Sequence, residues 1–167
     1  MFIMVIRISE ELNKLEVYYE ITDIDPQYSD TKEFCEKYSV NPENVINSLL
    51  ITSKGATPKY AMPVIQATRR IDVNHKLKNL TGFKRLSFAD SEKTKNITGM
   101  ELGAVTPFGL QDMDISLYVD KPIMNLDYII LGGGVRFQKI KTTPEIFKKI
   151  QYSSIADISQ EFNSSRI

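Results

Sequence analysis

Glycine-containing turns crowd into the second half of this chain. Six of its eight glycines fall within residues 98–134. Glycine adopts positive φ angles without strain and lets the backbone come close to a ligand, so such a concentration limits the regular structure that this stretch can form. We therefore predict tight turns and a candidate site in three runs: Thr98-Gly99, Gly103-Ala104-Val105-Thr106-Pro107-Phe108-Gly109 and Gly132-Gly133-Gly134.

The length fits one hydrophobic core. The chain has 167 residues, of which 42% are hydrophobic and 25% charged, and no apolar run reaches 18 residues. We expect one domain over residues 1–167, with a polar tail at 159–167 that frays and no membrane segment. The apolar opening, residues 1–6, lacks the features of a signal peptide and is expected to be a packed segment or a strand.

Few residues are available for metal or cysteine chemistry. The chain has one cysteine, Cys35, and one histidine, His75. An internal disulfide is therefore impossible, and a cytoplasmic location is favoured. A structural zinc site needs four Cys or His ligands, so we expect no metal and no cofactor. His75 lies in a polar stretch and is expected to be an ordinary surface residue.

Charge is unevenly distributed although the net charge is zero. Residues 1–50 hold four basic and ten acidic side chains, which leaves the remainder locally basic. Arg69, Arg70 and Lys139 are candidates for binding a polyanion such as tRNA, because phosphate contacts dominate nonspecific affinity for nucleic acids. Solvated helix faces are the alternative explanation.

Local patterns predict a mixed α/β or α+β domain. Helices are expected at 9–14, at 29–38, at 73–80 with Gly82 closing the helix, from Ser87 or Asp90 to Ile97, and at 143–150. A short helical turn is expected at 41–44, with Pro42 at its first position. Strands are expected at 15–21, 45–51, 60–67, 116–119, 128–131 and 136–140. The strand at 60–67 is expected to pair antiparallel with 45–51 across a turn at Gly55. Pro63 indicates an irregularity or a sheet edge there.

The order of these motifs resembles the YbaK/ProX family of aminoacyl-tRNA deacylases, which are related to the editing domain of bacterial prolyl-tRNA synthetases. The resemblance runs from about Leu12 to Ile158, and its specificity lies in the ordered set. The motifs that carry it are residues 41–50, Arg69-Arg70-Ile71-Asp72, Thr98-Gly99, the loop 103–109, Tyr118-Val119-Asp120, Gly132-Gly133-Gly134 and Ala156-Asp157-Ile158.

The resemblance implies a compact α/β domain with a mixed, largely antiparallel sheet flanked by helices. It also implies a pocket for the 3′ end of a mischarged tRNA, with the ester along the 103–109 loop. Backbone N–H groups of Gly103, Ala104 and Val105 are expected near the developing oxyanion. Further pocket residues are expected to be Tyr28, Thr98, Gly99, Thr106, Pro107, Phe108, Gly109, Gly133 and Gly134, although glycine-rich turns more often have a structural role.

One position departs from the family pattern. The family has a lysine two residues after the valine that begins the strand at Val45, and this chain has Asn47. Asparagine offers a neutral dipole where lysine offers a charge. We expect Asn47 to orient the ester or a water molecule.

Three functions remain open on the sequence alone. The first is a free-standing, metal-independent deacylase that removes a wrong amino acid, with tRNA for proline as the expected substrate. The second is a catalytically weak adaptor that binds aminoacyl-tRNA or a synthetase. The third is the same fold used for an unrelated ligand. The oligomeric state is also open.

Overall fold

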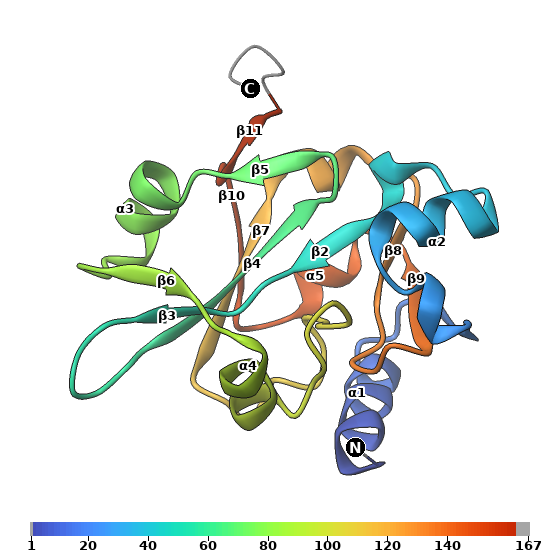
Figure 1. The fold of residues 1–167 in the computed structure, drawn as a ribbon, viewed down its shortest axis with the longest axis horizontal. Helices are drawn as coiled ribbons and strands as arrows, with labels where there is room; N and C mark the ends of the chain where they lie inside the picture. The colour runs from blue at the N-terminus through green and yellow to red at the C-terminus, as the bar shows by residue number, and fades with distance from the viewer. Residues whose placement is uncertain (1, 163–167) are drawn as a thin grey trace.

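The computed structural model describes residues 2–162 and forms a mixed α/β fold (Figure 1). Its helices are α1 (Phe2–Lys14), α2 (Thr31–Tyr38), α3 (Lys78–Thr81), α4 (Ser91–Thr98) and α5 (Ile146–Lys149). Short 3-10 turns lie at Pro26–Tyr28, Pro42–Asn44 and Lys121–Asn125, and a π-helical turn at Val73–Leu77. The strands are β1 (Tyr19–Asp23), β2 (Ile46–Ser48), β3 (Ile51–Ser53), β4 (Tyr60–Gln66), β5 (Arg69–Ile71), β6 (Leu86–Phe88), β7 (Ile115–Asp120), β8 (Ile129–Gly132), β9 (Gln138–Thr142), β10 (Ser153–Ala156) and β11 (Ser159–Glu161).

The strands form a six-stranded sheet and two smaller ones. The largest has the order β10-β7-β4-β3-β6, with β2 also paired to β4, and β1-β9-β8 forms a second sheet. β4 and β10 run parallel to β7, and the other strand pairs are antiparallel. An isolated parallel bridge joins Val45, the residue before β2, to Ile130 of β8, so the two sheets meet there. The expected mixed, largely antiparallel arrangement is confirmed.

Pro63 lies in the middle of the large sheet, in β4, between β7 and the β2–β3 side. The prediction that Pro63 lies at a sheet edge is wrong. The predicted irregularity is present, but it lies in the strand that pairs with β4. The expected strand at 45–51 is divided into β2 and β3, and Leu49 at the break donates its amide to the Pro63 carbonyl at 3.2 Å. Because proline has no N–H, it cannot continue the ladder on this side, and the partner strand is interrupted opposite it.

The N-terminal segment is a helix, so the predicted strand at residues 2–6 and helix start at Ser9 are wrong. Met4, Ile8 and Leu12 are buried at intervals of four residues, which places them on one face of α1. Glu16 follows the helix with φ 54°, and the strand expected at 15–21 begins at Tyr19. Met4 and Ile8 lie against Gly134, and Ile8 also lies against Gly109.

The segment after residue 158 is anchored where fraying was expected. β11 pairs antiparallel with β5, and Ser159 is buried. The buried carboxylate of Asp120 accepts hydrogen bonds from the Ser159 hydroxyl and from the Ile158 amide, the latter at 3.1 Å. This part of the prediction is wrong for residues 159–161, and the expected fraying at 163–167 lies outside the described residues.

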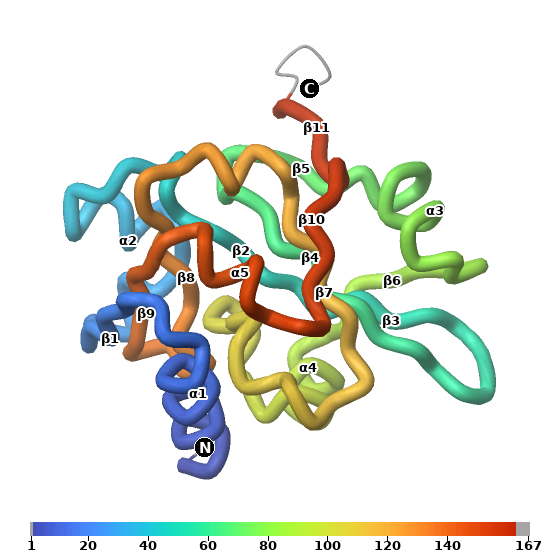
Figure 2. Tube along the Cα trace, turned by 180° about the vertical axis from the view of Figure 1, so that it is seen from behind, coloured from blue at the N-terminus to red at the C-terminus, as the bar shows by residue number. Residues whose placement is uncertain are grey.

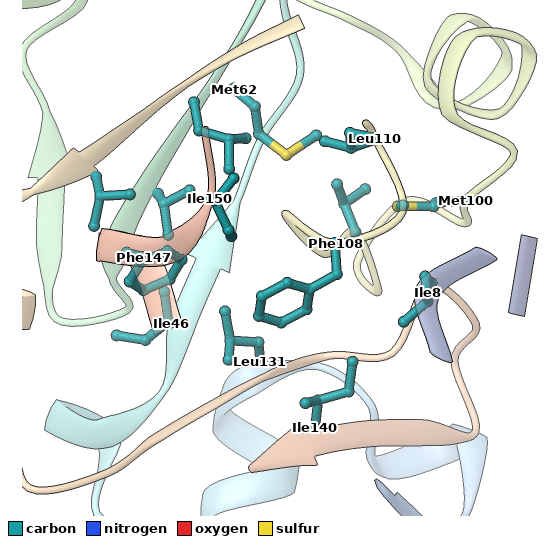
Figure 3. Close-up of a cluster of buried hydrophobic side chains, with 14 of the residues drawn as sticks. Ile8, Ile46, Met62, Met100, Phe108, Leu110, Leu131, Ile140, Phe147 and Ile150 are labelled. Carbon is teal, nitrogen blue, oxygen red and sulfur yellow. The ribbon is translucent and has the colours of Figure 1, made fainter. Parts of the chain in front are cut away.

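The main core lies between the two larger sheets, with α1 and α5 against it. Phe108 and Phe147 are fully buried and stack with ring centroids 6.5 Å apart (Figure 3). Seen from behind, α5 and β10 lie in front of β7 and β4 (Figure 2). In both views the segment between α4 and β7 lies between α4 and α1, which places the 103–109 loop beside the core.

The remaining predicted elements agree with the structure within a few residues. α2, α4 and the strands β7, β8 and β9 overlap their expected ranges, and Asp90 caps α4 by accepting the Lys93 amide at 2.8 Å. The helical region 73–81 ends at Gly82, which has φ 68°. Within residues 2–162, no helix is long and apolar enough to cross a membrane.

Candidate functional site

A cavity of about 270 Å³ opens where the two larger sheets meet. The start of α2, strand β2, the end of β8, strand β9 and the glycine-rich loop each contribute to its wall. The wall combines apolar and polar groups, with one lysine and one carboxylate. The lining residues are Asp30, Thr31, Val45, Ile46, Asn47, Ser48, Leu49, Gly103, Val105, Gly132 and Lys139.

Gly103 lies at the rim of the cavity with φ 87°. A Cβ atom here would lie 2.6 Å from Arg136 and 3.3 Å from Asp30, two residues that form an ion pair of 3.0 Å. Glycine is thus required both by the backbone angle and by the ion pair behind it. Within residues 2–162, the amides of Gly103 and Val105 donate to no protein group, and both residues line the cavity.

Ala104 differs from its two neighbours. Its amide donates to the Glu101 carbonyl at 3.0 Å, and its own carbonyl accepts from the Gly134 amide at 2.7 Å. Because both backbone groups are used internally, the position does not support the predicted role of the Ala104 amide at an oxyanion. Of these three loop residues, only Gly103 and Val105 therefore have amides without a protein acceptor.

Asn47 lies on β2 between this cavity and a second, larger one. It is half-buried, and its side-chain oxygen lies 3.5 Å from the Thr31 hydroxyl. The adjacent Ser48 hydroxyl is buried and has no hydrogen-bond partner within the described chain. An unpaired buried hydroxyl is unfavourable for the folded state.

Lys139 was predicted to lie on a surface that binds tRNA, but its side chain is buried. Only 7% of the residue is exposed, and its ammonium donates to the Ser29 carbonyl at 2.8 Å. The same nitrogen lies 4.9 Å from the centroid of the Phe34 ring. Burial, together with the nearby charge of Arg136, lowers the pKa of Lys139 to about 8. The structure therefore places this cation in the cavity wall and not on an exposed surface that binds a polyanion.

Arg69 and Arg70 lie together along the second cavity, an open groove of about 750 Å³ that shares Asn47 and Leu49 with the first. Arg69 is partly engaged, because its Nε lies 2.6 Å from the Ser159 hydroxyl and 3.5 Å from the Asp120 carboxylate. Arg70 is exposed and makes no side-chain hydrogen bond to the described residues. Phe88 also lines this groove and is 54% exposed.

Thr98 and Gly99 lie outside both cavities. The Thr98 hydroxyl donates to the Thr94 carbonyl at 2.7 Å and accepts the Met100 amide at 3.1 Å. Gly99 has φ 76° and ends helix α4. These contacts make the pair a helix C-terminus, and its position does not support the predicted contribution to the pocket floor.

The second half of the glycine-rich loop packs into the core. Phe108 is fully buried, and Gly109 donates its amide to Glu11 while its carbonyl accepts from Arg7, both on α1. Thr106 and Pro107 are also buried. Residues 106–109 therefore fix the loop to α1, and their position does not support direct contact with substrate. Only the first half, Gly103 and Val105, reaches the cavity.

The triple glycine is divided between the cavity and the protein interior. Gly132 lines the cavity, and a Cβ atom on it would lie 2.4 Å from the Ala104 carbonyl oxygen. Gly133 and Gly134, which were predicted to shape the pocket, instead face Gln138 and helix α1. The close approach of β8 to the glycine-rich loop explains why glycine is needed at residue 132.

Other polar candidates lie apart from the cavity. Tyr28 is half-buried in the turn before α2, and Lys37 lies 5.1 Å from its ring centroid. Its position does not support the predicted contact with substrate. His75 is exposed beside Asp72, in the wall of the larger groove. Within residues 2–162, no group of three His, Cys, Asp or Glu side chains is arranged to hold a metal ion.

Sequence reasoning missed Ser48, Asp30 and Thr31, and it assigned the pocket to Gly133 and Gly134 of the triple glycine, leaving out Gly132. For Gly132 a signal existed, because it belongs to the triple glycine already noted. For Lys139, the alternation of side chains along the strand did not indicate that this lysine is buried. Residues Lys139 and Lys141 share a face of β9, yet Ser29 and Phe34 contact only the first, and Lys141 is exposed.

Comparison with known proteins supports the resemblance seen in the sequence. Proline–tRNA ligase of Caldicellulosiruptor saccharolyticus is 27% identical in an alignment 142 residues long, which covers 78% of this chain and 24% of the ligase. This chain thus spans about a quarter of that relative. Among solved structures, hypothetical protein APE2540 has a TM-score of 0.81 at 20% identity over 92% of this chain and 99% of its own. A candidate trans-editing enzyme for prolyl tRNA synthetase has a TM-score of 0.77 at 16% identity, over 94% and 97%.

These two structures show that the fold is shared, since their sequence identity to this chain is low. The family is shown by a different comparison. The family model of the aminoacyl-tRNA editing domain matches residues 25–150, a range that includes α2, β2, the glycine-rich loop, β8 and β9. All the elements that form the cavity wall lie within it. The chain therefore belongs to the aminoacyl-tRNA editing domain family.

Proposed function

We propose that this protein is a free-standing trans-editing deacylase, built as one domain over residues 1–167, that hydrolyses the ester of a mischarged tRNA. The single observation that carries the proposal is the pair of free amides, Gly103 and Val105, at the wall of a cavity of about 270 Å³. Ester hydrolysis develops negative charge on the carbonyl oxygen, and fixed backbone N–H groups stabilise that charge without rearranging. The cavity has room for the aminoacyl group of an ester.

The larger groove suits the 3′ end of the tRNA. It shares Asn47 and Leu49 with the cavity, and its wall carries Arg69, Arg70 and the exposed ring of Phe88. An exposed aromatic ring stacks on a base, and an exposed guanidinium pairs with a phosphate. In the proposed complex the terminal nucleotide lies in the groove and the ester extends past Asn47 into the cavity.

Asn47 orients the ester or the attacking water in this proposal, through its amide dipole. The substrate ester is intrinsically labile, and its own amine or ribose hydroxyl helps to orient water once the ends are held together. The reaction then requires no metal ion. Similarity to proline–tRNA ligase makes tRNA for proline the first substrate to test. A substrate that is made where translation takes place gives the protein a cytoplasmic location.

One observation favours the adaptor alternative. The Ala104 amide is engaged internally, so the loop has fewer free amides than expected from the sequence, and the residue at position 47 on β2 is neutral. A protein with the groove but without turnover would bind aminoacyl-tRNA or a synthetase and act as an adaptor. Tight tRNA binding without ester cleavage distinguishes this alternative.

The experiment is single-turnover deacylation of alanyl- and cysteinyl-tRNA for proline in the presence of EDTA. We expect the wild type to exceed the spontaneous rate. Gly103→Pro is expected to abolish the excess, because proline removes the N–H and cannot adopt φ 87°. Gly82→Ala is the control, since Gly82 also has positive φ but lies outside both cavities, with nothing near its added Cβ.

Two results would contradict the deacylase. The first is a wild-type rate equal to the spontaneous rate with each aminoacyl-tRNA. The second is cleavage by Asn47→Lys alone, which would indicate that the natural protein lacks a necessary charge and would favour the adaptor. A separate binding measurement tests the groove. Arg70→Gln is expected to weaken tRNA binding and to reduce the slope of log K against log salt by about 1.

A further inference from the structure

Lys139 is the cation of the cavity wall. Of the described residues that line the cavity, Lys139 alone carries a positive charge, and Asp30 alone a negative one. Asp30 is already paired with Arg136 at 3.0 Å. No carboxylate of residues 2–162 lies within 4.0 Å of the Lys139 ammonium, whose contacts are the Ser29 carbonyl and the Phe34 ring.

Such an environment is unfavourable for an ammonium group. A buried charge that lacks an opposite charge loses hydration without a compensating ion pair. One of its three N–H donors is used by Ser29 at 2.8 Å, which leaves two without a protein acceptor in the described chain. At pH 7 the group is nevertheless mainly protonated, since its pKa is about 8. A positive charge is thus kept beside an open cavity.

We propose that Lys139 is a catalytic residue that contacts the carbonyl oxygen of the aminoacyl ester and stabilises the negative charge that develops on it. The inference rests on the proposed function. It adds the charged ammonium of Lys139 to the amide donors of Gly103 and Val105. It also gives β9 a role in stabilising or orienting the ester, which was expected from the sequence only for the glycine-rich loop and Asn47. The geometry that carries it is the burial of Lys139 in the wall of the cavity that Gly103 and Val105 also line, where Lys139 pairs across strands with Gly132.

The chemical step requires no further reagent. The oxygen of water attacks the carbonyl carbon, and the electron pair of the C=O bond moves to the carbonyl oxygen, where Lys139 lies. When this intermediate collapses, the bond between the carbonyl carbon and the ribose oxygen breaks. A proton that came from the water passes to the ribose oxygen. The products are the free amino acid and tRNA with its terminal hydroxyl restored.

An unpaired cation suits this step better than a paired one. The ester is neutral in the ground state, so Lys139 has no ionic partner when substrate binds. In the transition state the carbonyl oxygen becomes negative, and the pair forms only then. Interactions that strengthen between ground state and transition state raise the rate of the chemical step, whereas equal binding of both does not. Lys139 is therefore expected to affect turnover more than affinity.

The test is single-turnover deacylation at pH 7 with wild type, Lys139→Met, Lys139→Gln and Lys141→Met. Removal of one oxyanion donor typically lowers the rate about 10²- to 10³-fold. We expect a loss of this order for both variants of Lys139, with tRNA affinity within about twofold of wild type. Lys141→Met is the matched control, because Lys141 is an exposed lysine of the same strand that lies outside the cavity.

A pH profile separates a charge effect from a packing effect. The ratio of the wild-type rate to the Lys139→Met rate is expected to fall as pH rises through about 8, where Lys139 loses its charge. The charged or titratable groups that act on Lys139 are Arg136, Asp30 and Cys35. Only the ratio is informative, since spontaneous ester hydrolysis itself rises with pH. A purely structural role would give a ratio independent of pH.

The outcomes distinguish the inference from the function on which it rests. A large loss in both Lys139 variants, with a pH-dependent ratio, supports the role of Lys139. Wild-type turnover that persists in Lys139→Met overturns this inference and leaves the deacylase intact. No turnover by the wild type on any aminoacyl-tRNA overturns the proposed function, and the inference with it.

Discussion

Replacing Lys139 by methionine is expected to stabilise the protein near neutral pH. The pKa of Lys139 falls from 10.5 to about 8 on folding, chiefly because the ammonium is buried. Each pH unit of this difference corresponds to about 1.4 kcal/mol, so keeping the charge in the folded state at pH 7 costs ~3 kcal/mol. Methionine preserves the apolar stem and removes the charge. It also leaves the Ser29 carbonyl without its donor, which costs about 1 kcal/mol or more.

The expected net gain at pH 7 is therefore about 1–2 kcal/mol in the free energy of unfolding. The sign of the pH dependence follows from the direction of the pKa change. Between about pH 8 and pH 10.5 the unfolded chain binds more protons at Lys139 than the folded protein does, so wild-type stability rises with pH over this interval. The gain in Lys139→Met should shrink over the same interval and reverse near pH 10, where only the lost hydrogen bond remains.

Urea unfolding of wild type, Lys139→Met and Lys141→Met at pH 7 and pH 10 measures this difference. Lys141→Met should change stability by less than about 0.5 kcal/mol at either pH, because Lys141 is exposed. The reasoning is refuted if Lys139→Met is less stable than wild type at pH 7, or if its effect does not change between the two pH values. Either result would mean that the charge is well solvated or paired in the folded protein.

Three further substitutions test the scaffold around the cavity, each measured by thermal or urea unfolding. Gly132→Ala should destabilise by more than about 3 kcal/mol, since its Cβ would lie 2.4 Å from the Ala104 carbonyl oxygen, and a small loss would show that the loop yields easily. Phe108→Ala should cost about 3–5 kcal/mol as a core truncation, whereas a surface-like loss below 1 kcal/mol would contradict its burial. Asp120→Ala should destabilise by about 3 kcal/mol and raise hydrogen exchange at residues 158–161, because the Ile158 amide and Ser159 lose their acceptor. Unchanged exchange there would contradict that role.

Local signals predicted most elements whose boundaries depend on short-range chemistry. Pro42 at the start of its helical turn and Gly82 after α3 act within a few residues, and the structure confirms both boundaries. Of the two starts expected for α4, Ser87 and Asp90, the structure has Asp90. The misassigned elements depend on distant partners. β2 and β3 are divided by Pro63 of a neighbouring strand, and the final strand β11 exists because it pairs with β5 and bonds to Asp120.

The prediction for the N-terminal segment was wrong for a different reason. Met4, Ile8 and Leu12 have helical spacing, but the run of apolar residues at positions 2–6 also fits a strand. An uninterrupted apolar run carries no period of its own, so only the longer window distinguishes the two. The residues that α1 contacts, such as Gly109 and Gly134, lie about 100 positions away and give no local signal.

For the candidate site, the sequence identified the glycine-rich loop but not which of its residues face the cavity. Gly103 and Val105 line the wall, whereas Ala104, Phe108 and Gly109 bond or pack inward. Glycine content marks where the backbone turns, and it does not state on which side a ligand lies. That side is set by α1, which occupies the other face of the loop.

The polar groups around the cavity share one property. Lys139 is buried without a carboxylate partner, the Ser48 hydroxyl is buried without a hydrogen bond, and the amides of Gly103 and Val105 have no protein acceptor within residues 2–162. The buried Lys139 ammonium and the buried Ser48 hydroxyl oppose folding, whereas Gly103 is exposed, and buried unpaired hydroxyls also occur elsewhere, as at Thr94 and Thr106. What distinguishes the cavity is that a buried cation and two residues whose amides have no protein acceptor line one open volume. A single oxygen-rich ligand satisfies several of them together, which is what an ester approaching its transition state provides.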